Sequence, residues 1–207
     1  SNSMSYTSSK VTKLDYSFFL AASLAYFIVR QRDSAGLYLF DDAIVDRIPP
    51  KSSRGHLQTI LNKMDQAKLG MKTAMGKPFH EIADSIKKRG LVIIISDLLD
   101  DVDDIVSGLK HFRFDGNDVI VFHILDPFEV TYKFKDLVEL EDMETGEKIL
   151  VMPEAAKEVY LYNLERFRNT LKKNCGLLGI DYTTLDTETP LDHALFQYLA
   201  GRTKRGK

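Results

Sequence analysis

The feature that most constrains this chain is a run of aliphatic residues that ends in a carboxylate. Residues 90–97 read Gly-Leu-Val-Ile-Ile-Ile-Ser-Asp, with five large aliphatic side chains in succession. Such a run predicts a strand buried on both faces, as in the middle of a parallel sheet covered by helices. Ligands bind at the carboxyl ends of such strands, which places Asp97 where metal binding or chemistry would occur. The alternative role for Asp97 is to cap the following helix, because Asp is strongly preferred at that position.

The rest of the chain alternates between helical and strand patterns. Apolar residues at helical spacing predict helices over residues 13–31, 54–66, 78–88, 101–112, 153–175 and 191–199. Aliphatic or alternating runs predict further strands over residues 36–40, 43–48, 117–125 and 180–185, and an exposed hairpin over 137–152.

This order of elements predicts a single α/β domain over residues 1–207. Strands that alternate with helices require right-handed crossovers, which give a doubly wound, mostly parallel sheet with helices on both faces. The short connection between 36–40 and 43–48 indicates an antiparallel strand at the edge, which Pro49 and Pro50 should end. The hairpin at 137–152 would be inserted beside the main sheet.

Composition excludes several classes of function. The net charge of −2 gives no general attraction to nucleic acid or to anionic membranes. The single cysteine, Cys175, excludes a disulfide framework and is expected to be a small buried hydrophobe. Because the sequence contains no run of about eighteen apolar residues, we expect no membrane span and a cytoplasmic location.

The common catalytic and nucleotide-binding motifs are absent from the sequence. It contains no phosphate-binding loop, no Gly-x-Gly-x-x-Gly and no Gly-x-Ser-x-Gly elbow. The five histidines are scattered without metal-ligand spacing, and His123, inside a predicted strand, is expected to be a core imidazole. What remains is a set of hard oxygen ligands at the expected strand ends: Ser1, Ser3, Thr73 and Asp97. Such groups suit Mg²⁺ or Mn²⁺ in combination, although each alone can make a local backbone bond.

Short motifs along nearly the whole chain resemble one bacterial family. They include Ser1-x-Ser3-Met4, Lys13-Leu14-Asp15-Tyr16, Arg32-Asp33-x-x-Gly36-Leu37, Gly55-His56-Leu57, Ser96-Asp97-Leu98-Leu99-Asp100, His123-Ile124-Leu125-Asp126-Pro127 and Asp181-Tyr182. In these residues the chain resembles the von Willebrand factor A-like domain of the "domain of unknown function fifty-eight" proteins.

The resemblance implies a metal-ion-dependent adhesion site at the carboxyl ends of the strands. Its motif has Asp-x-Ser-x-Ser after the first strand, a Thr in a later loop and an Asp after the fourth strand. Ser1 and Ser3 match the two serines, and Thr73 and Asp97 match the later residues. The first Asp of the motif would precede Ser1 by two positions. We therefore expect the central first strand to be missing from this chain and the chain to be a C-terminal fragment of a longer protein.

The function implied by the resemblance is that of a non-enzymatic protein-interaction domain. The bound Mg²⁺ or Mn²⁺ would leave one position open for an acidic side chain of a partner. Members of the family are often encoded beside MoxR-type AAA+ ATPases, which implies a role in assembly or maturation of other proteins. Two alternatives stay open: a metal-independent scaffold, and an enzyme that uses Asp97 with Asp100 or Asp101 to bind Mg²⁺ for phosphoryl transfer. The enzyme is disfavoured because the sequence indicates no phosphate-cradling loop and no positioned lysine.

Overall fold

The computed structural model describes residues 2–67, 75–132, 138–141, 148–151, 153–192 and 195. Its elements are η1 (Asn2–Ser5), α1 (Lys13–Arg30), β1 (Ala35–Phe40), β2 (Ile44–Lys51), α2 (Arg54–Asp65), α3 (Gly76–Ser85), β3 (Leu91–Ser96), α4 (Val102–Phe114), β4 (Asp118–Leu125), α5 (Pro127–Thr131), β5 (Val138–Glu141), β6 (Lys148–Val151), α6 (Pro153–Leu177) and β7 (Asp181–Asp186). Most of the helix and strand predictions are thereby confirmed. The helix expected at 191–199 lies mostly outside the described residues.

The centre of the fold is a parallel three-stranded sheet in the order β3-β4-β7. Its middle strand is β4, in which every residue after Asp118 is buried. The prediction that residues 91–96 form the middle strand was wrong for the described sheet, since β3 lies at its edge and Leu91 is 42 % exposed. Both aliphatic runs suit a buried strand, and only the pairing distinguishes the middle strand from the edge strand.

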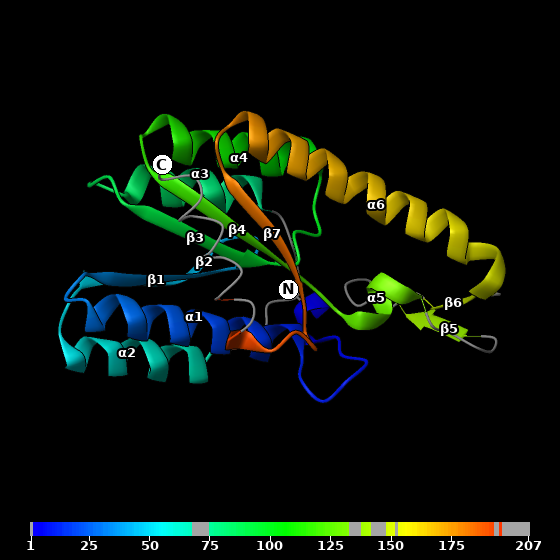
Figure 1. The fold of residues 1–207 in the computed structure, drawn as a ribbon, viewed down its shortest axis with the longest axis horizontal. Helices are drawn as coiled ribbons and strands as arrows, with labels where there is room; N and C mark the ends of the chain where they lie inside the picture. Colours follow the sequence, from blue (N-terminus) through cyan, green and yellow to red (C-terminus); the bar gives the residue numbers. More distant parts are fainter. Residues whose placement is uncertain are drawn as a thin grey trace.

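Helices cover both faces of this sheet (Figure 1). Val119 and Val121 of β4 pack into a core with α3, α4 and α6, whereas the alternate residues Ile120 and Phe122 pack against α1. This division follows from the strand itself, because successive side chains point to opposite faces. The mixed α/β class with helices on both faces is confirmed.

The hairpin of β1 and β2 is a separate antiparallel pair that packs with α1 and α2. The predicted hairpin is confirmed, but within the described residues it is not hydrogen-bonded to the main sheet. The prediction that Pro49 and Pro50 end the second strand was wrong, because β2 runs through both prolines to Lys51. Proline is tolerated there because β2 pairs on one side only, so a missing N–H need not interrupt a ladder.

A cavity of about 850 Å³ lies between the hairpin and the parallel sheet, lined by β1, β3, α1 and α3. Among the described residues, β3 pairs only with β4 and β1 pairs only with β2. The two strand edges beside the cavity therefore have no ladder partner in this part of the chain. The expected absence of a central first strand and the finer von Willebrand factor A-like topology both stay predictions.

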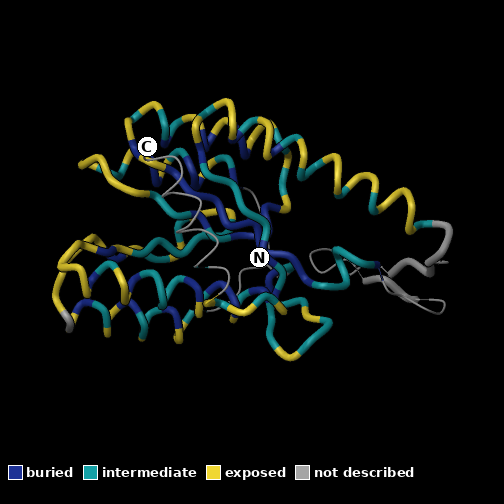
Figure 2. The backbone as a smooth tube through the Cα atoms, viewed as in Figure 1, coloured by how far each residue is buried: buried dark blue, intermediate teal, exposed yellow. Residues whose placement is uncertain are grey.

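The long helix α6 extends beyond the sheet, above α5 and the predicted hairpin β5-β6 (Figure 1). The N-terminal half of α6 is largely exposed along the described stretch, whereas its C-terminal half covers the sheet (Figure 2). In the described part of the chain no helix has both the length and the apolarity to cross a membrane. The single-domain prediction over residues 1–207 stays a prediction.

Candidate functional site: a buried charge cluster at the strand ends

Asp97 directly follows β3 and is 1 % exposed. The backbone turns sharply there, since Leu98 has a φ of 51° and its N–H donates to Ser96 Oγ at 3.1 Å. The N-cap of α4 is Asp101, whose carboxylate accepts a hydrogen bond from the Asp103 N–H. Asp97 therefore does not cap this helix, and its carboxylate points to other partners.

The partner of Asp97 is Lys13, at the start of α1. The Lys13 Nζ lies 3.1 Å from Asp97 Oδ2 and 2.7 Å from Glu129 Oε1. Lys13 is 0 % exposed, which is rare for lysine and is stabilised only when the charge is paired. Thr12 caps α1 by accepting from the Asp15 N–H, so the first turn of the helix directs Lys13 at the ends of the strands.

Glu129 is held in place by a capping box at the N-terminus of α5. The Asp126 carboxylate accepts from the Phe128 N–H at 2.8 Å, and Glu129 Oε2 accepts from the Asp126 N–H at 2.7 Å. Asp126 is fully buried and also accepts from the Ser8 N–H at 2.8 Å and from the Ser8 hydroxyl. This network connects the N-terminal loop, α1, β3 and α5 at one edge of the sheet.

His123 of β4 lies next to this cluster on the other side of the sheet. The pKa of His123 is lowered to about 4, chiefly by burial, with the charges of Arg168 and Lys13 adding to the shift and Asp97 opposing it. Its Nδ1 is 2.6 Å from the Tyr182 hydroxyl of β7. The core imidazole expected from the sequence is confirmed, because His123 is 1 % exposed and its ring is hydrogen-bonded. Cys175 is likewise buried, and burial raises the pKa of its thiol to about 12, as suits a packing residue.

The four predicted metal ligands have different outcomes. Asp97 lies at the predicted strand end, and Ser3 lies in η1, which packs against α1, the helix that carries Lys13. Ser1 and Thr73 lie outside the described residues. The Met75 N–H donates to Asp100, so the chain just after Thr73 returns to this edge.

The described residues do not by themselves fit a divalent cation. Among them, no three side chains of His, Cys, Asp or Glu gather as metal ligands would. The Lys13 ammonium already neutralises Asp97, and a second cation beside Asp97 would be repelled by it. Mg²⁺ and Mn²⁺ sites usually depend on carboxylates, and here the candidate carboxylate is occupied by an internal cation. The metal site of Ser1, Ser3, Thr73 and Asp97 stays a prediction.

Sequence reasoning missed Lys13, Asp126 and Glu129 as members of this cluster, together with the short helix α5. The sequence does carry a signal for α5, because Asp126-Pro127-Phe128-Glu129 has an N-cap Asp, a Pro at the first helical position and a Glu at the third. Lys13 has no such signal, since a lysine in the first turn of a helix normally lies in solvent.

Comparison with known proteins identifies the family of this α/β domain. The chain belongs to the family described as "Protein of unknown function DUF58", which matches residues 1–166. Uncharacterised proteins of Mycobacterium bovis and Mycobacterium tuberculosis are 24 % identical to it over 151 residues, which cover 70 % of this chain and 46 % of theirs. The chain thus spans about half the length of these curated relatives.

Two solved structures have a similar fold. The conserved hypothetical protein BatB from Bacteroides thetaiotaomicron superposes with a TM-score of 0.60 at 17 % identity, over 99 % of this chain and 95 % of that one. An aerotolerance-related membrane protein from Bacteroides fragilis superposes with a TM-score of 0.58 at 19 % identity, over 95 % and 92 %. At these identities the likeness concerns the fold. Because one neighbour is called a membrane protein, the expected cytoplasmic location stays a prediction.

Proposed function

We propose that this chain is a non-enzymatic protein-interaction domain that binds its partner at the carboxyl edge of the parallel sheet. The observation that carries the proposal is the ion-paired cluster of Lys13, Asp97 and Glu129. Lys13 pairs with both carboxylates inside the protein, so the cluster holds α1, the end of β3 and α5 in one arrangement. A rigid edge formed by several loops suits recognition of a protein surface.

The partner proposed from the family resemblance is a MoxR-type AAA+ ATPase, with a role in assembly or maturation of other proteins. The geometry favours the metal-independent form of this interaction, because Lys13 supplies a positive charge beside Asp97. The metal-dependent form is supported by the position of η1, which holds Ser3 and packs against α1, the helix whose Lys13 pairs with Asp97. In that form Mg²⁺ or Mn²⁺ would recruit an acidic side chain of the partner.

Two exposed leucines offer a matched test of where the partner binds. Leu99 follows β3 at the carboxyl edge and is 50 % exposed, whereas Leu177 ends α6 at the opposite edge and is 78 % exposed. Binding to a purified MoxR-type ATPase from the same organism would be measured by biolayer interferometry. We expect Leu99→Asp to weaken binding at least about tenfold, as loss of a central interface contact does. We expect Leu177→Asp to leave it unchanged, and equal effects of the two would overturn the proposed surface.

The role of metal is tested on the chain alone. A ligand that binds only the folded state raises the melting temperature by mass action. We expect millimolar Mg²⁺ or Mn²⁺ to leave the melting temperature unchanged. A rise that Asp97→Asn abolishes would instead establish the metal-dependent form, and the experiment thereby separates the two versions of the interaction domain.

A phosphoryl-transfer domain is the second candidate, and one observation favours it. The positioned lysine that the sequence did not reveal is present, because Lys13 Nζ lies 3.1 Å from Asp97 Oδ2. The burial of Asp97, which is 1 % exposed, opposes it, since a phosphodonor has no direct access to the carboxylate. Incubation with Mg²⁺ and labelled acetyl phosphate is expected to leave no label on Asp97. Stable labelling that Asp97→Asn removes would replace the interaction-domain proposal.

A further inference from the structure

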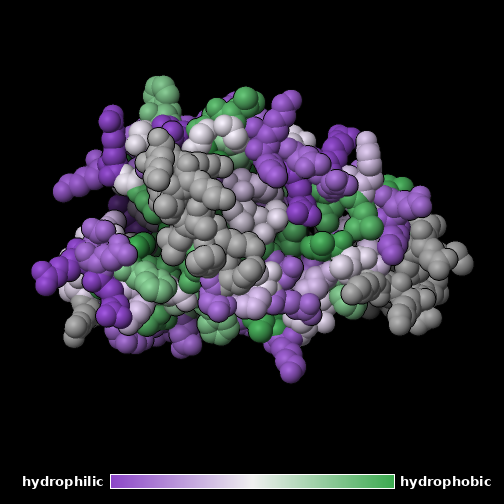
Figure 3. Space-filling view, viewed as in Figure 1, coloured by the Kyte–Doolittle hydropathy of each residue, from purple (hydrophilic) through white to green (hydrophobic). Residues whose placement is uncertain are grey.

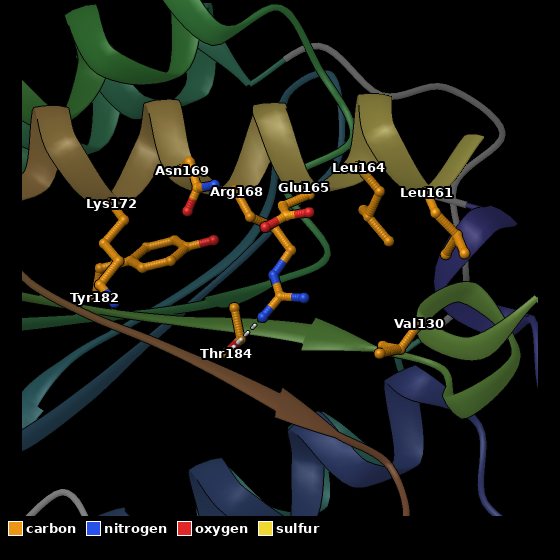
Figure 4. Close-up of a pocket in the computed structure, with 9 residues that line it drawn as sticks. All are labelled: Val130, Leu161, Leu164, Glu165, Arg168, Asn169, Lys172, Tyr182 and Thr184. Carbon is orange, nitrogen blue, oxygen red and sulfur yellow. Dashed lines mark hydrogen bonds between the residues drawn. The ribbon is translucent and has the colours of Figure 1, made fainter. Parts of the chain in front are cut away.

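A second polar site lies on the other side of the sheet, beneath α6. A pocket of about 400 Å³ is lined by residues of α6, by Tyr182 and Thr184 of β7, and by Val130 of α5. Figure 4 shows the α6 side chains along its roof and Arg168 extending from the helix toward Thr184. All of these residues belong to the described part of the chain. The pocket is large enough for a small organic ligand.

The unusual feature of this pocket is the guanidinium of Arg168. Its Nη2 donates to Thr184 Oγ1 at 3.2 Å, whereas its Nε is buried and has no hydrogen-bond partner. Among the described residues, no carboxylate lies within ion-pair distance of Arg168. Buried donors are nearly always paired, and a charged donor without a partner is especially costly. The described residues therefore leave the positive charge of Arg168 without a carboxylate, and this side chain lines the pocket.

The surroundings of Arg168 define what kind of anion fits. Lys172, one turn further along α6, adds a second positive charge, and Glu165 adds one negative charge from the preceding turn, which leaves the lining with a net positive charge. The Tyr182 hydroxyl is held by His123 Nδ1 at 2.6 Å, so this wall of the pocket is fixed. Burial raises the pKa of Tyr182, so the wall offers a neutral phenol and no competing anion.

The other end of the pocket is apolar. Leu161, Leu164 and Val130 lie together at the end toward α5, away from Lys172 and Tyr182 (Figure 4). Figure 3 shows hydrophobic side chains gathered beneath α6, next to polar side chains of that helix. A ligand that fills both ends needs a charged head and an aliphatic body.

We propose that the Arg168 pocket binds a small organic carboxylate. Its head group would pair with the Arg168 guanidinium and face Lys172, and its aliphatic body would pack against Leu161, Leu164 and Val130. The planar fork of a guanidinium matches the two oxygens of a carboxylate, which favours this anion as the head group. The site is separate from the charge cluster of Lys13, and this proposal does not depend on the proposed interaction function.

The test uses hexanoate, a carboxylate with a short aliphatic body, in isothermal titration calorimetry. Acetate supplies the head group alone, and hexanol supplies the body without the charge. We expect hexanoate to bind more tightly than either probe, and Arg168→Gln to weaken hexanoate binding at least about tenfold. Arg166→Gln is the matched control, because Arg166 lies on the same helix but is exposed. Equal binding by the two variants, or hexanol binding as tight as hexanoate binding, would overturn the proposal.

A second variant keeps the proposal falsifiable if Arg168→Gln does not fold. Leu164 precedes Arg168 by four residues on α6, an i,i+4 spacing at which a glutamate and an arginine pair on a helix. We expect Leu164→Glu to supply the missing carboxylate from within the chain, abolish hexanoate binding and raise the melting temperature. Leu164→Gln, the uncharged control, removes the same aliphatic contact and is expected to weaken hexanoate binding only a few-fold. Hexanoate binding by Leu164→Glu equal to that of Leu164→Gln would contradict the assignment of Arg168 as the anion partner.

Discussion

Lys13 and Arg168 are two cations on opposite faces of the same sheet, and they differ in how their charges are satisfied. Lys13, in α1, is fully buried and contacts two carboxylates, at 3.1 and 2.7 Å. Arg168, in α6, lies over a pocket with a buried Nε that has no partner among the described residues. A cation paired inside the chain fixes the structure around it, whereas an unpaired one leaves a position for a ligand. The comparison therefore indicates that Lys13 stabilises the folded structure and that Arg168 is free to bind a ligand.

The largest effect that would sharpen this comparison is expected for Lys13→Met. The variant leaves Asp97 and Glu129 without their cation, and breaking a buried pair in this way costs about 3–5 kcal/mol. Urea unfolding measures the loss. Lys63→Met is the control, because its pair with Asp46 at 2.7 Å has side chains 37 % and 32 % exposed, and such surface pairs contribute at most about 1 kcal/mol. Equal losses would show that the Lys13 cluster is not a structural element.

The next effect concerns His123, which lies between the two cations. Its pKa of about 4 is below the ordinary value of 6.5, so between these pH values the unfolded chain binds a proton that the folded chain does not. The free energy of unfolding therefore falls as the pH drops from 6.5 to 4 and no longer responds to this group below 4. The expected contribution is about 3 kcal/mol.

Urea unfolding of the wild-type chain and of His123→Asn across this pH window isolates that contribution. The carboxylates around His123 are shared by both proteins, so the difference between their two pH profiles reports the imidazole. We expect the variant profile to be flatter by up to one proton. Parallel profiles would show that the imidazole is protonated in the folded state, despite its burial and the charges of Arg168 and Lys13.

The smallest effect is expected for the stability of Arg168→Met. Because Arg168 makes no ion pair among the described residues, its replacement removes no attraction between charges and relieves an unpaired donor. We expect the free energy of unfolding to change by less than about 1 kcal/mol or to rise slightly. A loss as large as that of Lys13→Met would erase the contrast and would make Arg168 a structural residue.

The local sequence pattern predicted most of the helices and strands, but it did not predict the order of the strands in the sheet. The aliphatic runs at 91–95 and 119–122 both indicate buried strands, and each forms one. Which run is central depends on a neighbour far away in sequence, β7, which pairs with β4 and not with β3. The same limit applies to Pro49 and Pro50, since their tolerance in β2 depends on which side of the strand is paired.

The candidate site divides in a similar way. Asp97 could be predicted because it follows an aliphatic run, and its position at the end of β3 is confirmed. The metal ligands Ser1 and Thr73 lie outside the described residues, and the set stays a prediction. Lys13 and Arg168 could not be singled out, because in sequence each is one of 28 Lys and Arg residues, which are normally solvated.

The sequence by itself determined the α/β class, the alternation of helices and strands, and an acidic residue at the end of a strand, because these depend on periodicity and on neighbours along the chain. Only the tertiary structure decided that Lys13 is enclosed by carboxylates 84 and 116 residues away, and that the Arg168 Nε is buried without a partner. The physical reason is that the free energy of a charge depends on its burial and its partners, and both are set by contacts between distant segments.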